Sequence, residues 1–324
     1  MRNRRFILTA CAMLAGTCLG PASAENYPSK PIRWVVAYAA GGGSDALARA
    51  VGTQLSTQLG QPVLVDNRPG GATAIAAENV AKSPGDGYTV FTADNGTLIF
   101  NTALFTKLPY DPKKDFVPVG LMARFPLLLA VNPGAGYADV KALIEAAKAS
   151  PGKLSYATPG IGGPHHLAME MLKERARIDV VHVAYRGAAP AIQDVVGGQL
   201  PLMVVDTAAG MQMIKAGKLK ALATFSKTRL GAMPDVPTLM ELGYTDIEAF
   251  AWQGLVVPSS TPKDVVARLS TELQKAIRSA PVQAQFDAMG LEPTPSDAAA
   301  MHRLWAQDDQ YWPRLIRERG ISLD

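Results

Sequence analysis

The chain has 324 residues, of which 48% are hydrophobic, so it is long and apolar enough to bury the cores of two lobes. Its 32 lysines and arginines face 28 aspartates and glutamates, and the formal charge at pH 7 is only +4. A charge this small gives no electrostatic case for nucleic acid or another polyanion as a partner.

The first 24 residues have the order of a secretory signal peptide. Residues 1–5 are basic, residues 6–19 are almost wholly apolar or small, and Ala22-Ser23-Ala24 offers a small-x-small cleavage site. We expect cleavage after Ala24 and export of a soluble protein. Both cysteines leave with this segment, which excludes disulfides, thiolate metal sites and cysteine nucleophiles from the mature protein. Three arginines leave as well, so the charge falls to +1.

A glycine-rich segment follows the first predicted strand. The mostly apolar run 32–37 leads into Gly41-Gly42-Gly43-Ser44-Asp45, and a helical pattern starts at residue 46. Unpaired N–H groups and the dipole at such a helix start favour an anion, and glycines let a ligand approach the main chain. Nucleotide phosphate is disfavoured, because no lysine follows the glycines and the third glycine of a dinucleotide fingerprint falls on Ala46. A structural alternative stays open, in which the glycines only let the helix start tightly against the sheet.

Strand and helix patterns then alternate along the chain. Strands predicted at 63–65, 88–91, 127–131, 154–157, 180–183 and 202–205 alternate with helices predicted at 73–81, 137–149, 164–174, 188–196 and 208–216. This alternation is typical of the α/β class, with parallel or mixed sheets covered by helices on both faces. From Ser260 onward helical spacing dominates, as in Val266, Leu269, Leu273 and Ile277, and further helices are expected at 281–289 and 296–316.

The length and the helical tail predict two lobes, with the tail packing back on the first lobe. We expect a signal peptide at 1–24, a discontinuous first lobe at 25–123 and 227–324, and a second lobe at 124–226. Because ligands of open α/β sheets bind beyond the carboxyl ends of the strands, strand-end residues are the candidates for a cleft between the lobes. The candidate ligand-binding residues are Tyr38, Ala39, Ala40, Gly41, Gly42, Gly43, Ser44, Asp45, Gly71 and Asn95 in the first lobe, and Thr158, Gly160, Gly162, Gly163, His165, Arg186 and Asp206 in the second.

Three of these candidates have a second interpretation. Asp45 is favoured as a helix cap or loop-orienting group over direct contact with an anion. Asp206 either binds a ligand amino or hydroxyl group or caps the next turn. Arg186 either clasps a second carboxylate with a two-pronged hydrogen bond or is a solvated surface residue.

The sequence predicts no catalytic, metal or cofactor site. His165, His166 and His182 do not predict a metal, because adjacent histidines diverge on a helix and no acidic ligand is evident nearby; ring donation from His165 to a ligand is favoured over metal binding. A serine hydrolase needs Gly-x-Ser-x-Gly at a strand-to-helix elbow, and the segment around Ser44 lacks the final glycine. We therefore expect a binding protein that is not an enzyme, with a periplasmic hydrolase as a disfavoured alternative.

Several blocks of residues occur in a fixed order that resembles a known family. The blocks at 32–49, 63–71, 184–191, 197–199, 234–238 and 252–255 look like those of the Bug solute-binding proteins, the extracytoplasmic receptors of tripartite tricarboxylate transporters. The resemblance covers essentially the whole mature chain. Blocks in fixed order are far more specific than any single motif.

The resemblance implies a type II-like periplasmic binding protein fold, in which two α/β lobes close on a small organic carboxylate in a cleft between them. It implies that residues 38–45 and residues 158–165 hold the ligand carboxylate through main-chain groups and bridging water. It also implies a periplasmic location and a membrane permease as the partner, with presentation of the closed form to a sensor kinase as the alternative. No cofactor is implied, and we expect a monomer.

Two departures from the family pattern concern the ligand. Ala37, Ala39 and Ala40 stand where family members often have prolines, which leaves the first loop less stiff. Residues 184–187 read Ala-Tyr-Arg-Gly in place of the usual Pro-Tyr-Lys-Gly, which puts Arg186 where lysine is common. The sequence therefore says least about how the protein binds the end of the ligand that lies farthest from the first carboxylate.

Overall fold

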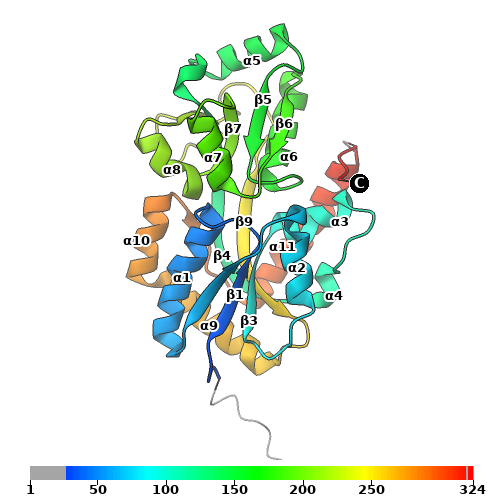
Figure 1. Cartoon of the computed structure of the whole chain (residues 1–324), viewed down its shortest axis with the longest axis vertical. Helices are drawn as coiled ribbons and strands as arrows, with labels where there is room; N and C mark the ends of the chain where they lie inside the picture. Colours follow the sequence, from blue (N-terminus) through cyan, green and yellow to red (C-terminus); the bar gives the residue numbers. More distant parts are fainter. Residues whose placement is uncertain (1–26, 319, 324) are drawn as a thin grey trace, which may run out of the picture.

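The computed structural model describes residues 27–318 and 320–323, so the signal-peptide prediction lies outside it. Among these residues, ten strands form one mixed sheet in the order β2-β1-β3-β9-β4-β7-β5-β6, and β8 and β10 each pair with β4 (Figure 1). The strands are β1 (Ile32–Val36), β2 (Val63–Asn67), β3 (Thr89–Asp94), β4 (Phe116–Val131), β5 (Ser155–Thr158), β6 (Val181–Ala184), β7 (Leu202–Asp206), β8 (Lys220–Thr224), β9 (Phe250–Pro258) and β10 (Glu292–Pro293).

Strand β1 shows why the apolar runs of this sequence form strands. It pairs in parallel with β2 on one side and β3 on the other, with Trp34 opposite Val65 and Val90. A parallel strand covered by helices is buried on both faces, and it therefore reads as a nearly continuous apolar run. Trp34 is fully buried, and its indole N–H donates to Thr92 Oγ1 at 2.6 Å. The prediction of a strand from this run is confirmed.

The long strand β4 changes partners along its length. Residues 116–126 pair antiparallel with β9, whereas residues 127–131 pair antiparallel with β7 and β8. We call the part of the sheet that contains β1, β2, β3, β9, β10 and residues 116–126 sheet A, and the part that contains β5, β6, β7, β8 and residues 127–131 sheet B. In Figure 1 sheet A lies in the lower part of the molecule and sheet B in the upper part.

The helices cover both parts of the sheet. In Figure 1, α1 and α10 lie on one side of sheet A and α2, α4 and α11 on the other. The main helices are α1 (Gly43–Leu59), α2 (Ala74–Ala81), α3 (Asn101–Leu104), α4 (Pro112–Asp115), α5 (Val140–Ala149), α6 (Pro164–Ala176), α7 (Ala188–Val196), α8 (Thr207–Lys215), α9 (Lys263–Arg278), α10 (Ala280–Met289) and α11 (Ala298–Glu318). Shorter turns are η2 (Gly71–Thr73), the π-helix η3 (Gly96–Phe100) and η4 (Pro133–Ala135). The apolar face predicted for α9 is buried at all four spaced positions, Val266, Leu269, Leu273 and Ile277.

Four stretches of strand were not predicted from the sequence, namely the first part of β4, all of β8, all of β9 and the short β10. Residues 116–126 contain Pro118, Gly120 and Pro126, which argue against a regular strand. The register shifts between Pro118 and Gly120 and again between Leu121 and Ala123, so bulges accommodate these residues. Long antiparallel pairing between segments more than 100 residues apart leaves no local pattern that predicts it.

Candidate functional site

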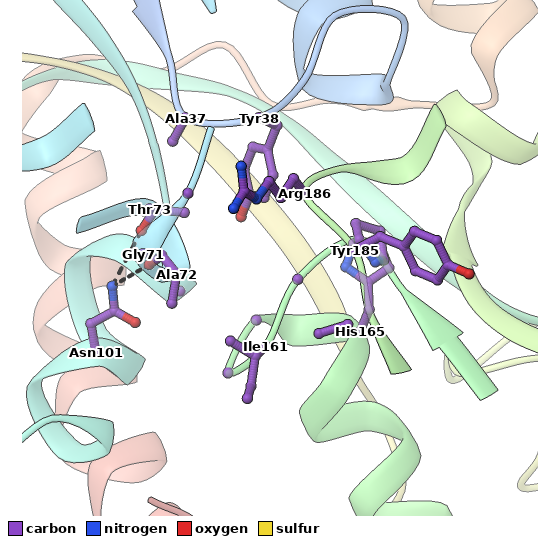
Figure 2. A pocket seen from close by; sticks show the side chains of 17 residues that line it. Ala37, Tyr38, Gly71, Ala72, Thr73, Asn101, Ile161, His165, Tyr185 and Arg186 are labelled. Carbon is purple, nitrogen blue, oxygen red and sulfur yellow. Dashed lines mark hydrogen bonds between the residues drawn. The ribbon is translucent and has the colours of Figure 1, made fainter. Parts of the chain in front are cut away.

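A cavity of about 200 Å³ lies where sheets A and B adjoin, beyond the carboxyl ends of β1, β5 and β6 (Figure 2). Its walls come from residues 37–38, 70–73, 159–163 and 184–186, together with Gly96, Asn101 and His165. Among the described residues that line it, Arg186 is the one lysine, arginine, aspartate or glutamate, and its side chain is exposed. A single positive charge and several helix starts make this space favourable to an anion.

Residues 38–45, which we call the first loop, connect β1 to α1. Gly42 caps α1 without a side-chain hydrogen bond, so the first-turn N–H groups of the helix have no partner from the cap. Asp45 instead accepts the N–H of Gly41 at 2.9 Å and pairs with Arg49. Burial opposes ionisation of Asp45, but the hydrogen bonds from Arg49 and Gly41 outweigh it and lower its pKa. Asp45 therefore holds the loop in shape, which is the role favoured for it from the sequence.

Tyr38 lies at the start of the first loop and faces the cavity. Its hydroxyl donates to Asp94 Oδ2 at 2.5 Å. Burial, and then the charge of Asp94, raise the pKa of Tyr38 well above its ordinary value. The phenol consequently stays protonated at any physiological pH.

The first loop also touches sheet B directly. The N–H of Ala39 donates to the carbonyl of Arg186 at 3.1 Å. A Cβ added to Gly43 would lie 2.5 Å from Asp206 Oδ1 and 2.9 Å from Ala208 Cβ. The start of α1 therefore approaches the start of α8 so closely that only glycine fits at position 43.

A second, much smaller cavity of about 20 Å³ lies beside this contact and has room for about one water molecule. Gly42, Gly43 and Ser44 line it on one side and Asp206 on the other. Gln253 of β9 donates from Nε2 to Ser44 Oγ, and its Oε1 is buried without a partner among the described residues. Polar groups of both sheets therefore meet at this point.

Residues 158–165, which we call the second loop, connect β5 to α6. Thr158 donates from Oγ1 to the carbonyl of Gly160 at 2.8 Å, and the N–H of Gly162 donates to His166 Nδ1 at 3.1 Å. Gly163 caps α6 without a side-chain bond, which leaves first-turn N–H groups of this helix beside the cavity as well. His165 Nε2 lies 3.2 Å from Asp206 Oδ2.

Two stacked histidines stand behind the second loop. The rings of His166 and His182 are 4.0 Å apart with an interplanar angle of 11°. Burial lowers the pKa of His166 to about 4 and that of His182 to about 3, and the nearby Lys173 adds to both shifts. Both rings are therefore neutral at pH 7, and His166 Nδ1 is free to accept the N–H of Gly162.

A strained turn at residues 70–73 forms the wall opposite the second loop. Gly70, Gly71, Ala72 and Thr73 have φ values of 124°, 55°, 47° and 74°, so four successive residues lie at positive φ. For the two that are not glycine, this conformation costs roughly 1–3 kcal/mol each. Asn101 Nδ2 bonds the carbonyl of Ala72 at 2.7 Å and Thr73 Oγ1 at 3.2 Å, and so holds the turn in place.

The sequence-predicted site residues divide into three groups in the structure. Those lining the larger cavity are Tyr38, Gly71, Gly160, Gly162, Gly163, His165 and Arg186. Those lining the smaller cavity are Gly42, Gly43, Ser44 and Asp206, with Tyr38 and His165 shared between the two. Those lining neither are Ala39, Ala40, Gly41, Asp45, Asn95 and Thr158. In the third group, Ala39, Asp45 and Thr158 shape the loops through the hydrogen bonds described above, and Asn95 donates to the carbonyl of Phe250 at 3.2 Å.

Asp206 has the capping role, one of the two alternatives that the sequence left open. It caps α8 by accepting the N–H of Ala209 at 2.9 Å, and its other oxygen faces His165. Sequence reasoning missed Asn101, Ala72, Thr73 and Gln253. Gln253 could have been predicted as a site residue, because it is a polar residue inside the apolar run 250–258. No comparable pattern around Asn101 predicts that its side chain reaches the cavity.

Comparison with known proteins identifies the family. The model described as tripartite tricarboxylate transporter family receptor, TctC, matches residues 47–321. The chain belongs to the TctC receptor family. A UPF0065 protein from the tcbD-tcbE intergenic region of Pseudomonas sp. strain P51 is 36% identical over 322 residues, which cover 99% of this chain and 96% of that protein. The Bordetella pertussis protein BugT is 33% identical over 304 residues, 94% of this chain and 93% of its own.

Solved structures agree with the TctC assignment. One described as a periplasmic transporter has 37% identity and a TM-score of 0.89, and covers 92% of this chain and 100% of its own. An R. palustris protein solved with adipate has 30% identity and a TM-score of 0.89 over 92% of this chain and 100% of its own. MatC from Rhodopseudomonas palustris with bound malate has 28% identity and a TM-score of 0.85 over 90% of this chain and 100% of its own.

These comparisons confirm the predicted fold class, a type II-like periplasmic binding protein with two α/β lobes and a cleft between them. The relatives of this TctC receptor are periplasmic solute-binding proteins and not enzymes, and the receptor is periplasmic like them. Within residues 27–318 and 320–323, no helix is both long and apolar enough to cross a membrane. The same residues form no group of three or more histidine or acidic side chains that could hold a metal ion.

Proposed function

We propose that this receptor, after export and cleavage behind Ala24, captures a small organic carboxylate and delivers it unchanged to a membrane permease. The observation that carries the proposal is the 200 Å³ cavity, which the start of α6 adjoins and to which Arg186 supplies the one permanent charge among the described lining residues. The start of α1 lines the smaller cavity beside it. The related structures with malate and with adipate support the ligand class, because both ligands are dicarboxylic acids.

In this proposal the ligand is held between a first lobe, residues 25–123 with 227–324, and a second lobe, residues 124–226. One carboxylate of the ligand accepts hydrogen bonds from main-chain N–H groups of the first and second loops, directly or through water. The ligand touches both loops only when the lobes are closed, so binding shifts the population toward the closed form. The bond between Ala39 and Arg186 joins the first loop to the segment after β6 in that form.

The experiment that tests the ligand class compares the unmodified protein with a variant of Arg186. Its guanidinium can donate two parallel hydrogen bonds to a second carboxylate. Calorimetric titration of the mature protein, freed of co-purified ligand by unfolding and refolding, should find 1:1 binding of at least one dicarboxylate. Arg186→Gln should weaken that dicarboxylate about 10- to 100-fold and a monocarboxylate of the same length by less than threefold.

The matched control is Arg303→Gln, which removes an exposed arginine on α11 outside both cavities. This control should leave every affinity unchanged. A panel in which no carboxylate binds, or in which a ligand is converted to product, would contradict the proposal. Equal losses for mono- and dicarboxylates would remove the proposed role of Arg186 alone.

A further inference from the structure

Asn101 lies at the first position of α3 and is only 1% exposed, yet it lines the larger cavity. Its side-chain nitrogen lies 2.7 Å from the carbonyl of Ala72, 3.0 Å from the hydroxyl oxygen of Tyr110 and 3.2 Å from Thr73 Oγ1. Three acceptors therefore surround one NH₂ group. The strained 70–73 turn depends on two of these bonds.

The orientation of this amide is fixed by its neighbours. A backbone carbonyl such as that of Ala72 only accepts hydrogen bonds. The Tyr110 hydroxyl donates its own hydrogen to the carbonyl of Thr97, at 2.6 Å. It therefore can only accept a hydrogen bond from Asn101. A flipped amide would set an oxygen against both acceptors. The NH₂ group consequently faces the turn, and Oδ1 must face the other way.

Figure 2 shows where that oxygen goes. Asn101 Oδ1 points into the open space of the cavity, on the side of Ile161, while the dashed bonds from its nitrogen run toward Ala72 and Thr73. No donor among the described residues bonds this oxygen. An acceptor that is held rigidly against a ligand space is satisfied only by a donor that the ligand or a water molecule brings.

The charges around the cavity limit the chemistry of that donor. A second carboxylate placed against Oδ1 would set two acceptors against each other. An ammonium group would lack an ionic partner, because no aspartate or glutamate is among the described residues that line the larger cavity. A hydroxyl group satisfies the oxygen without a charge.

Resting on the proposed function, we infer that Asn101 Oδ1 is a specificity-determining acceptor that selects a carboxylate bearing a hydroxyl group. A site built to bond a hydroxyl rejects the analogue that lacks it, because its own polar group is then left unpaired. The strained turn serves this selection, since it gives Asn101 the acceptors that fix its orientation.

Matched acids test the inference on the unmodified mature protein. Calorimetry compares lactate with propionate, each enantiomer of malate with succinate, and each enantiomer of 2-hydroxyglutarate with glutarate. The methyl ether of each hydroxy acid and aspartate complete the panel. In the pair of fitting length, the hydroxy acid should bind at least tenfold more tightly than both its deoxy analogue and its methyl ether.

The outcomes separate this inference from the proposed function. Binding of carboxylates with no preference within any pair, or equal binding of the methyl ether, overturns the inference and leaves carboxylate capture standing. Tighter binding of aspartate than of either malate overturns the choice of hydroxyl. Failure of every acid to bind overturns both.

A variant then assigns the preference to Asn101. In Asn101→Ala the ratio of hydroxy-acid to deoxy-acid affinity should fall to about one, whereas a purely structural role would weaken both acids equally. Thr102→Ala, which changes the next and exposed residue of α3, should keep the ratio of the unmodified protein. An unchanged ratio in a folded Asn101→Ala protein overturns the assignment, and the matched acids decide the matter if that variant does not fold.

Discussion

Gly43 sets how closely the start of α1 approaches sheet B. An alanine there would place its Cβ 2.5 Å from Asp206 Oδ1 and 2.9 Å from Ala208 Cβ, across the contact between the starts of α1 and α8. If the ligand-free protein is open, this clash exists only on closing. Gly43→Ala should therefore weaken the best carboxylate roughly 5- to 150-fold while the Tm of the ligand-free protein stays nearly unchanged. Calorimetry and thermal melting measure the two effects.

Gly42 provides the control at the neighbouring position. A Cβ there would lie 3.6 Å from Ala188, an ordinary contact distance, and its φ of −88° suits any residue. Gly42→Ala should change affinity by less than about threefold. Equal losses in the two variants, or a fall in Tm of the ligand-free Gly43→Ala protein that matches its loss of affinity, would contradict closure through this contact.

The second loop and the helix that follows it depend on two neutral histidines. His166 and His182 stack at 4.0 Å, and Tyr156, Glu170 and Lys173 are the other titratable groups that face them. Burial lowers the pKa values to about 4 and about 3, against about 6.5 in the unfolded chain. Between pH 6.5 and 4 the unfolded chain therefore binds more protons, so stability falls as the pH falls.

This element gives a prediction of pH dependence. The free energy of unfolding should drop by roughly 1 kcal/mol per pH unit for each histidine as the pH falls from about 6 to 4. Urea unfolding at a series of pH values measures it. His182→Phe keeps an aromatic ring beside Tyr156 and should remove about half of the slope, whereas His302→Gln, which changes an exposed histidine on α11, should leave it intact. A slope that His182→Phe does not alter would show that other groups cause it.

The sequence predicted elements better where they are local than where they pair over long distances. Helix α7 was predicted with its observed bounds, and the alternation from β1 to α8 follows from apolar runs and glycine or proline boundaries. The first part of β4 and all of β8, β9 and β10 were not predicted. In β4, bulges around Pro118 and Gly120 interrupt the strand pattern, and its partner β9 is more than 100 residues away in sequence. Only the folded chain brings these segments together.

The residues of the candidate site were likewise predicted where they have a local sequence signature and missed where they do not. The two glycine-rich loops and Arg186 were found because a strand-to-helix turn has a local signature. The wall at residues 70–73 was found only at Gly71, since nothing in the sequence predicts positive φ at Ala72 or Thr73. Asn101 follows an apolar stretch in the π-helix η3, and only the tertiary bonds from its side chain show that it reaches the cavity.

At the scale of the whole molecule, β4 is the strand that sheets A and B share. Its pairing changes from β9 at Pro126 to β7 at Leu127 and to β8 at Leu128. The chain passes between the two sheets a second time between β8 and β9, where the N–H of Phe225 donates to the carbonyl of Leu127. A motion that opens the cleft must therefore bend the chain at few places, which is the arrangement of a hinge.

Closure around such a hinge is testable in solution. A saturating carboxylate, at about 100 times its Kd, should raise the Tm by roughly 5–10 °C and lower the radius of gyration measured by small-angle X-ray scattering. Gly43→Ala, saturated with the same ligand, should show a smaller decrease in the radius of gyration, because its clash with Asp206 and Ala208 opposes the closed form. Identical scattering of the unmodified protein with and without ligand would contradict closure, and a rise in Tm would then have to come from binding to a cleft that is already formed.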